Sequence, residues 1–171
     1  EVNATVGGTT QTNSGPYNHF GVYDLNATAA YGYSFSQWTG DVDGLGDLNA
    51  SITMITMTGD ATVTAHFARN PYGLTVNADE GGDANGSGSY AYETHASITA
   101  TPDQGYHFSS WTGAGIADPN AASTTVNMDQ NRSVTAQFAL SNQAPTEIHL
   151  SNLSVPENEP VGTLVGEFNA T

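Results

Sequence analysis

The stretch Gly32-Tyr-Ser-Phe-Ser-Gln-Trp-Thr-Gly40 returns further along the chain as Gly105-Tyr-His-Phe-Ser-Ser-Trp-Thr-Gly113. Two flanking blocks return in the same order. Val2-Asn-Ala4 returns as Val76-Asn-Ala78, and Val63-Thr-Ala-His-Phe-Ala68 returns as Val134-Thr-Ala-Gln-Phe-Ala139. Blocks that keep their order while the spacing between them changes indicate two copies of one small module whose loops differ in length.

Apolar and polar residues alternate within these blocks, as they do along strands that bury one face. The alternating set Leu25, Ala27 and Ala29 is matched in the second copy with Ala96, Ile98 and Ala100. No stretch shows the apolar period of about 3.6 residues that is typical of a helix. The sequence therefore predicts a mainly β fold of two tandem β-rich modules, each with about five short strands.

Aromatic residues recur at the same places in both copies, which favours a core role. An aromatic side chain buries on the order of 150 to 250 Å², so a few of them supply most of the core of a small module. The predicted core residues are Tyr33, Phe35, Trp38 and Phe67 in the first copy, and Tyr106, Phe108, Trp111 and Phe138 in the second.

The charge balance excludes several classes of partner. The chain has 17 acidic residues and only two basic ones, both arginine, which gives a formal net charge of -15. Such a surface repels nucleic acid and anionic lipid headgroups and attracts cations. There is no cysteine for a disulfide or a thiolate site. No apolar run approaches the roughly 18 residues of a membrane span, so we expect no membrane insertion.

The densest acidic cluster contains Asp41, Asp43 and Asp47, which are interleaved with glycines. Carboxylates spaced around glycines can wrap oxygen ligands about calcium, although the full EF-hand spacing is missing. The alternative is a solvated acidic loop, because the second copy lacks most of these carboxylates. The five histidines are scattered and have no partner at the spacing of a zinc site.

Tyr90 and Tyr92 share one face of a predicted strand. Exposed tyrosines of this kind can stack on sugar rings, so the pair is the candidate glycan-binding surface. The acidic residues are not placed as two carboxyl groups across a cleft, the arrangement that glycoside hydrolysis needs. We therefore expect no enzymatic activity.

The Gly-Tyr-x-Phe-x-x-Trp-Thr-Gly pattern and the closing Val-Thr-Ala-x-Phe-Ala block resemble the divergent B-repeat family of bacterial surface proteins, of the internalin type. The resemblance covers residues 1–69, as an N-terminally truncated first module, and residues 72–140 as a second. It implies a β-grasp-like fold. It also implies extracellular stalk or accessory modules without catalysis of their own.

Residues 141–171 have a different character and begin with a short polar linker that ends in proline. They resemble the first strands of a bacterial cadherin-like domain, which implies an incomplete β-sandwich hairpin. In that family the glutamate of the Glu-Asn pair is a calcium ligand, so the resemblance implies this role for Glu157.

These features favour a non-catalytic spacer region of a secreted or surface-displayed bacterial protein, with a role in adhesion or domain display. Its expected partners are the neighbouring domains of the same parent chain, and glycans or other cell-surface components. Calcium is the one cofactor that the sequence suggests. The alternative is a carbohydrate-binding accessory region of a secreted polysaccharide-degrading enzyme.

Overall fold

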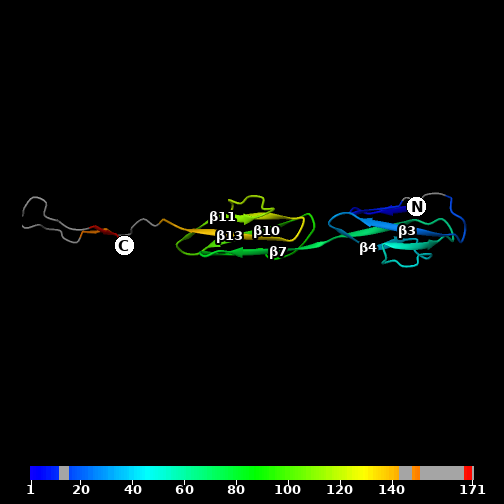
Figure 1. The fold of residues 1–171 in the computed structure, drawn as a ribbon, viewed down its shortest axis with the longest axis horizontal. Helices are drawn as coiled ribbons and strands as arrows, with labels where there is room; N and C mark the ends of the chain where they lie inside the picture. Colours follow the sequence, from blue (N-terminus) through cyan, green and yellow to red (C-terminus); the bar gives the residue numbers. More distant parts are fainter. Residues whose placement is uncertain (12–15, 143–147, 151–167, 171) are drawn as a thin grey trace, which may run out of the picture.

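The structure is a computed structural model that describes residues 1–11, 16–142, 148–150 and 168–170 (Figure 1). The first repeat consists of strands β1 (Val2–Ala4), β2 (Gly8–Thr10), β3 (Val22–Ala29), β4 (Tyr33–Gly40), β5 (Ile52–Thr56) and β6 (Val63–Arg69). The second repeat consists of β7 (Pro71–Ala78), β8 (Gly82–Asn85), β9 (Gly88–Ala91), β10 (Thr94–Pro102), β11 (Tyr106–Gly113), β12 (Ser123–Met128) and β13 (Arg132–Leu140). A short antiparallel pair follows, made of β14 (Ile148–Leu150) and β15 (Phe168–Ala170).

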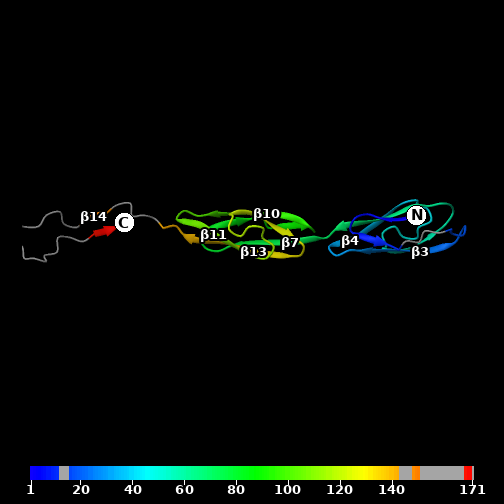
Figure 2. The ribbon, with the colours of Figure 1, turned by 90° about the horizontal axis from the view of Figure 1, so that it is seen from above.

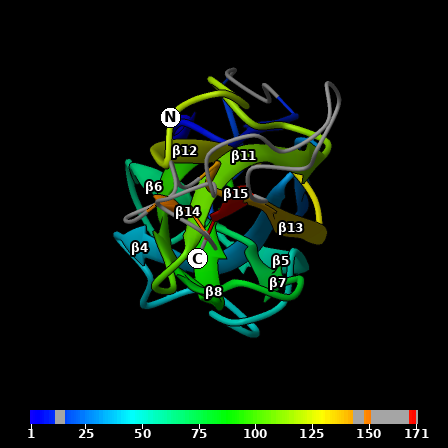
Figure 3. The same ribbon diagram turned by 90° about the vertical axis from the view of Figure 1, so that its left-hand side faces the viewer.

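The two repeats lie end to end along one axis, as two perpendicular views show (Figures 1 and 2). Seen along this axis, they overlap (Figure 3). Each repeat contains two small sheets. The strand order is β1-β6-β4 and β2-β3-β5 in the first repeat, and β11-β13-β7-β9 and β12-β10-β8 in the second. The predicted mainly β fold of tandem repeats is confirmed.

A bulge in β4 explains why the repeated motif places Phe35 and Trp38 three positions apart. Phe35 and Trp38 are three positions apart, so a regular strand would place them on opposite faces. The pairing of β4 with β6 shifts between Phe35 and Gln37, and this extra residue brings both rings to one side. Their ring centroids lie 5.6 Å apart. The same shift follows Phe108 in β11, so the spacing of the motif encodes the bulge.

Each repeat has its own core around its tryptophan. Trp38 is 2% exposed and Trp111 is 3% exposed. The indole N–H of Trp38 donates to the carbonyl of Ala50 at 2.9 Å, and that of Trp111 donates to the carbonyl of Ala121 at 3.0 Å. Each indole therefore fills the core and also fixes the long loop that follows its strand.

The other predicted core residues lie around these tryptophans. Phe35 and Phe67 in the first repeat, and Phe108 and Phe138 in the second, are partly buried against the two cores. Tyr33 and Tyr106 are half-buried at the end of each sandwich. Their rings lie over the glycine turn after the opening strand, where a Cβ on Gly7 or Gly81 would strike them.

The structure corrects several expectations from the sequence. The described residues form six strands in the first repeat and seven in the second, where the sequence predicted about five in each. The copies also align differently along β3 and β10: Tyr23 pairs with Ile55 as Ala96 pairs with Val126, so Leu25 corresponds to Ile98 and not to Ala96. The opening strand of each repeat runs parallel to its closing strand, an arrangement that alternation alone does not reveal.

No helix occurs among the described residues, so the helix of a β-grasp fold is absent from them. It follows that no helix in this part of the chain could cross a membrane. Glu157 lies outside the described residues.

Candidate functional site: the junction between the repeats

The two repeats are joined through a single residue, because β6 ends at Arg69 and β7 begins at Pro71. The residue between them is held from both sides. The backbone N–H of Asn70 donates to the carbonyl of Gly32 in the first repeat at 2.8 Å. Its carbonyl accepts from the N–H of Tyr92 in the second repeat, also at 2.8 Å. The hydroxyl of Ser34 donates to the side-chain oxygen of Asn70. The linker is therefore part of the folded structure of both repeats.

Four tyrosines gather around this linker, and Tyr92 is at their centre. Its ring lies 5.7 Å from that of Tyr31 and 5.6 Å from that of Tyr33, both in the first repeat. It lies 6.2 Å from the ring of Tyr72 in its own repeat. All three contacts have edge-on geometry, which is favourable for aromatic pairs and contributes about 0.5 to 1.5 kcal/mol each.

Gly32 allows the ring of Tyr92 to come this close. A Cβ at position 32 would collide with the Tyr92 ring. Gly32 also has a φ of 80°, a conformation that other residues adopt at a cost. The glycine of the repeated motif is thus required twice, by the turn and by the contact with the next repeat.

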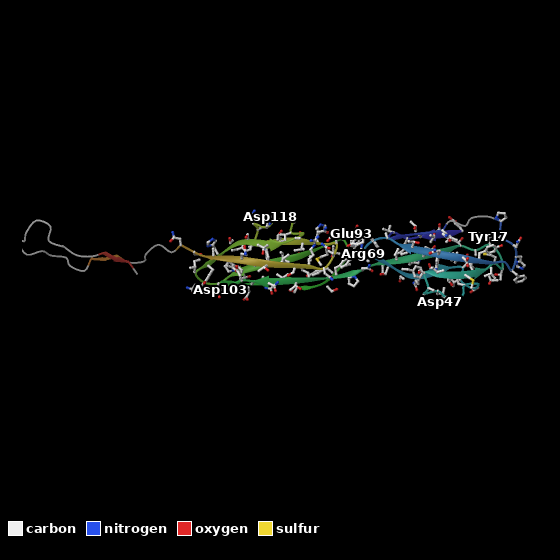
Figure 4. The ribbon with its side chains drawn as sticks, viewed as in Figure 1. Tyr17, Asp47, Arg69, Glu93, Asp103 and Asp118 are labelled. Atoms are coloured by element: carbon white, nitrogen blue, oxygen red, sulfur yellow. The ribbon has the colours of Figure 1, made fainter. Side chains whose placement is uncertain are left out.

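Polar contacts surround the tyrosine cluster. The Tyr31 hydroxyl donates to the carbonyl of Asp129 at 3.1 Å, and the Tyr33 hydroxyl donates to the carboxylate of Glu93 at 3.3 Å. Arg69 lies 3.8 Å from the same carboxylate, near the middle of the molecule in Figure 4. The side chains of this ion pair are 47% and 54% exposed, so it adds little stability. The ring contacts of Tyr92 with Tyr31 and Tyr33 and the hydrogen bonds between the repeats therefore hold the junction together, and the exposed ion pair contributes less.

The junction is expected to loosen in alkaline solution. Burial raises the pKa of Tyr72, helped by the Tyr31 hydroxyl, and burial also raises the pKa of Tyr92, helped by the charge of Glu93. A raised pKa means that the folded state favours the neutral phenol. The stabilisation is therefore complete below the ordinary tyrosine pKa of about 10, and is lost as pH rises through the raised values.

Spin labels on the two repeats would measure this effect as a distance distribution that stays narrow up to about pH 10 and broadens above it. A chain with both Tyr72→Phe and Tyr92→Phe cannot ionise at these positions and is expected to broaden less. Equal broadening in both chains would show that these tyrosines are not responsible.

The structure gives Tyr90 and Tyr92, the candidate glycan-binding pair, different surroundings. Tyr90 is half-buried against the second core, and its hydroxyl donates to the carbonyl of Gly86 at 2.8 Å. Tyr92 is half-buried in the junction. Glycan binding at these residues stays a prediction from the sequence.

The acidic loop of the first repeat is organised by its own backbone. A carboxylate oxygen of Asp41 accepts from the N–H of Thr62 at 2.8 Å, and one of Asp47 accepts from the N–H of Asn49 at 2.8 Å. Asp118 makes the same turn as Asp47 in the second repeat, with the N–H of Asn120 at 2.9 Å. This equivalence indicates a structural role for Asp47.

Within the described ranges, no three histidine, cysteine, aspartate or glutamate side chains are grouped so that they could hold a metal ion. This search covers Asp43 as well as its acidic neighbours. Calcium binding by this loop and by Glu157 therefore stays a prediction from the sequence.

Sequence reasoning missed the junction, although a signal for it exists. The copies differ at their ends: Tyr31 corresponds to Gln104, and Arg69 corresponds to Leu140. Tyr31 and Arg69 are the residues that contact the second repeat, so these differences between the copies indicate where the repeats meet.

Comparison with known proteins agrees with the repeat boundaries at the junction. The family model described as the divergent InlB B-repeat domain matches residues 1–71 and again residues 72–142. No curated protein and no solved structure matches the chain.

Proposed function

The chain belongs to the divergent InlB B-repeat family, and we propose that its two repeats form a non-catalytic spacer that holds neighbouring domains of a secreted or surface-displayed bacterial protein apart. Repeats of this family are typically non-catalytic and are associated with bacterial surface and secreted proteins. To this family character we add two points. The repeats lie outside the cell, and their mechanical role is to hold a distal domain at a distance for adhesion.

The observation that carries this proposal is the junction. A spacer transmits distance only if its units do not fold back on one another. The linker between these repeats is one residue, it is hydrogen-bonded on both sides, and it is surrounded by four tyrosine rings. Flexible linkers instead leave their residues free of such contacts. These contacts support a spacer in which the two repeats stay end to end at a fixed relative orientation.

The arrangement of the loops fits the same role. The loop after β4 in the first repeat and the loop after β11 in the second lie on opposite sides of the long axis (Figure 1). Successive repeats thus present equivalent surfaces in different directions. The high negative charge keeps such an extended chain soluble and limits non-specific association.

Replacement of Tyr92 by serine is the direct test of the spacer. The change removes the ring that contacts Tyr31, Tyr33 and Tyr72, so the two repeats are expected to bend relative to each other. Small-angle X-ray scattering should show a shorter maximum dimension, and spin labels on the two repeats should show a broader distance distribution.

His19→Ser is the matched control. Phe20 and Glu93 have the same backbone conformation, with φ of 60° and 63°, and their N–H groups donate to the equivalent carbonyls of Met57 and Met128. His19, the residue before Phe20, is therefore the counterpart of Tyr92, and it is exposed. His19→Ser should leave both measurements unchanged. If the wild-type chain already shows a broad distribution, or if Tyr92→Ser does not widen it, the two repeats are not a rigid spacer.

A further inference from the structure

One outward face of the first repeat is apolar, although the solvent side of an antiparallel sheet is ordinarily polar. The face belongs to the sheet β2-β3-β5, where Val22, Ile52 and Met54 are 58%, 68% and 54% exposed. Ile52 and Met54 are two positions apart on β5, so their side chains lie on the same side of the sheet. Val22 shares that side, because Met54 pairs with Asp24, two positions along β3 from Val22. We call these three residues the apolar face.

The second repeat carries polar residues at the same three places. Its strands β10 and β12 pair in the same register as β3 and β5, with Ala96 opposite Val126 as Tyr23 is opposite Ile55. The fold therefore does not need apolar side chains there, and their presence in the first repeat favours a contact with another molecule. Counted from these pairs, the counterparts of Val22, Ile52 and Met54 are His95, Ser123 and Thr125.

A neighbouring repeat does not cover this side of the sheet. The second repeat has the first repeat before it, and His95 and Ser123 are nevertheless exposed, while Thr125 is half-buried. A repeat placed in the same way before the first one would therefore leave the apolar face accessible. The second repeat, which follows the first, leaves it accessible as well.

A carboxylate beside the apolar face has no lysine or arginine of this chain available to it. Asp24 is exposed and lies opposite Met54, where the second repeat has Ser97. The chain contains no lysine, and its two arginines, Arg69 and Arg132, are paired with other carboxylates. A second copy of the chain supplies no further cation, and two copies with a net charge of -15 repel each other. A basic side chain for Asp24 must therefore come from a different molecule.

The chemistry of this surface favours a protein as the partner. The aliphatic side chains of the apolar face offer no ring on which a sugar could stack. The carboxylate of Asp24 and the negative charge of the chain disfavour nucleic acid and anionic lipid headgroups. A protein segment that presents apolar side chains next to a lysine or arginine matches both features. Burial of the apolar side chains would drive the contact, and the charge pair would orient it.

We propose that the apolar face, together with Asp24, binds a protein segment in which aliphatic side chains alternate with lysine or arginine. The aliphatic side chains of the segment pack on Ile52 and Met54, and one of its cations pairs with Asp24. The site lies on the side of the first repeat, so binding there does not depend on the rigidity of the junction. The contact is small, so a single segment binds with a dissociation constant of about 1 mM or somewhat below.

The test is an NMR titration of the full chain, with isotope-labelled isoleucine and methionine methyl groups, in about 0.15 M salt. The probe is a synthetic peptide of alternating valine and arginine. The methyl signals of Ile52 and Met54 should shift and give a dissociation constant of about 1 mM or below. A peptide with serine in place of valine, and one with glutamate in place of arginine, should each bind at least about tenfold more weakly.

The second repeat provides the matched variants. Ile52→Ser combined with Met54→Thr gives the first repeat the side chains of the second, and should lower the association constant by about tenfold or more. The fold accepts these residues, because Ser123 and Thr125 already occupy the equivalent places. The reverse change, Ser97→Asp with Ser123→Ile and Thr125→Met, should create a second binding site on the second repeat.

Far-UV circular dichroism should confirm that the variants are folded. A chain whose Ile52 and Met54 methyl signals do not respond to the probe overturns the proposal. So does binding that survives Ile52→Ser with Met54→Thr, or that the serine peptide matches, because it would be general attraction of a basic peptide to an acidic chain. Methyl signals that move with the concentration of the chain alone would show that a second copy covers the face, which also contradicts the proposal.

Discussion

Replacement of Trp38 by alanine is expected to unfold the first repeat while the second stays folded. Trp38 is 2% exposed, and its N–H holds the following loop through Ala50. Removing a buried tryptophan costs about 3 to 5 kcal/mol. A small module that has no disulfide and a thin core has little more stability than this to lose.

The two repeats should not respond equally. Among the described residues, six are buried in the core of the first repeat and nine in that of the second. The second core contains Leu74, Ile98 and Met128, all of which are nearly inaccessible to solvent. Trp111→Ala is therefore expected to weaken the second repeat while more of it stays folded than of the first repeat in Trp38→Ala.

Each repeat contains one tryptophan, which makes the measurement direct. In Trp38→Ala, the fluorescence of Trp111 reports only on the second repeat, while far-UV circular dichroism reports on both. In urea, the dichroism should show lost structure before any denaturant is added, and the fluorescence should follow a later transition. Coincident transitions at low urea would mean that the repeats unfold as one unit and that their cores are not independent.

The sequence predicted the features that depend on local patterns. Repetition revealed the two units, and alternation revealed the strands. The sequence did not predict the parallel pairing of β1 with β6 or the bulge after Phe35, because both depend on which strands become neighbours. The alignment error along β3 has a similar cause. Tyr23 and Ala96 are equivalent in the structure but differ in size, so matching by residue type shifted Leu25 from Ile98 to Ala96.

The junction was harder to predict for a different reason. Its residues come from four separate segments, around Tyr31, Arg69, Tyr92 and Asp129. In either repeat alone, these residues form an ordinary exposed end. The one-residue linker brings them together. The sequence signal for the junction therefore lies in the positions where the two copies differ, and not in the positions that they share.

Gly32→Ala is expected to open the junction, and Gly105→Ala is its matched control. Both glycines follow the same strand in their repeat and have similar φ values, 80° and 87°. Alanine in this conformation costs about 1 to 2 kcal/mol in either repeat. The new methyl group at position 105 meets no atom within 4 Å, but at position 32 it collides with the ring of Tyr92.

Any difference between the two variants beyond this shared strain therefore measures the junction itself. Gly32→Ala must push the Tyr92 ring away from Tyr31 and Tyr33, at a further cost of about 0.5 to 1.5 kcal/mol for each ring contact that is lost. Spin-label distances between the repeats should broaden in Gly32→Ala and stay narrow in Gly105→Ala. If both variants keep a narrow distribution, the one-residue linker alone sets the orientation of the repeats. The tyrosine cluster would then be a consequence of that orientation and not its cause.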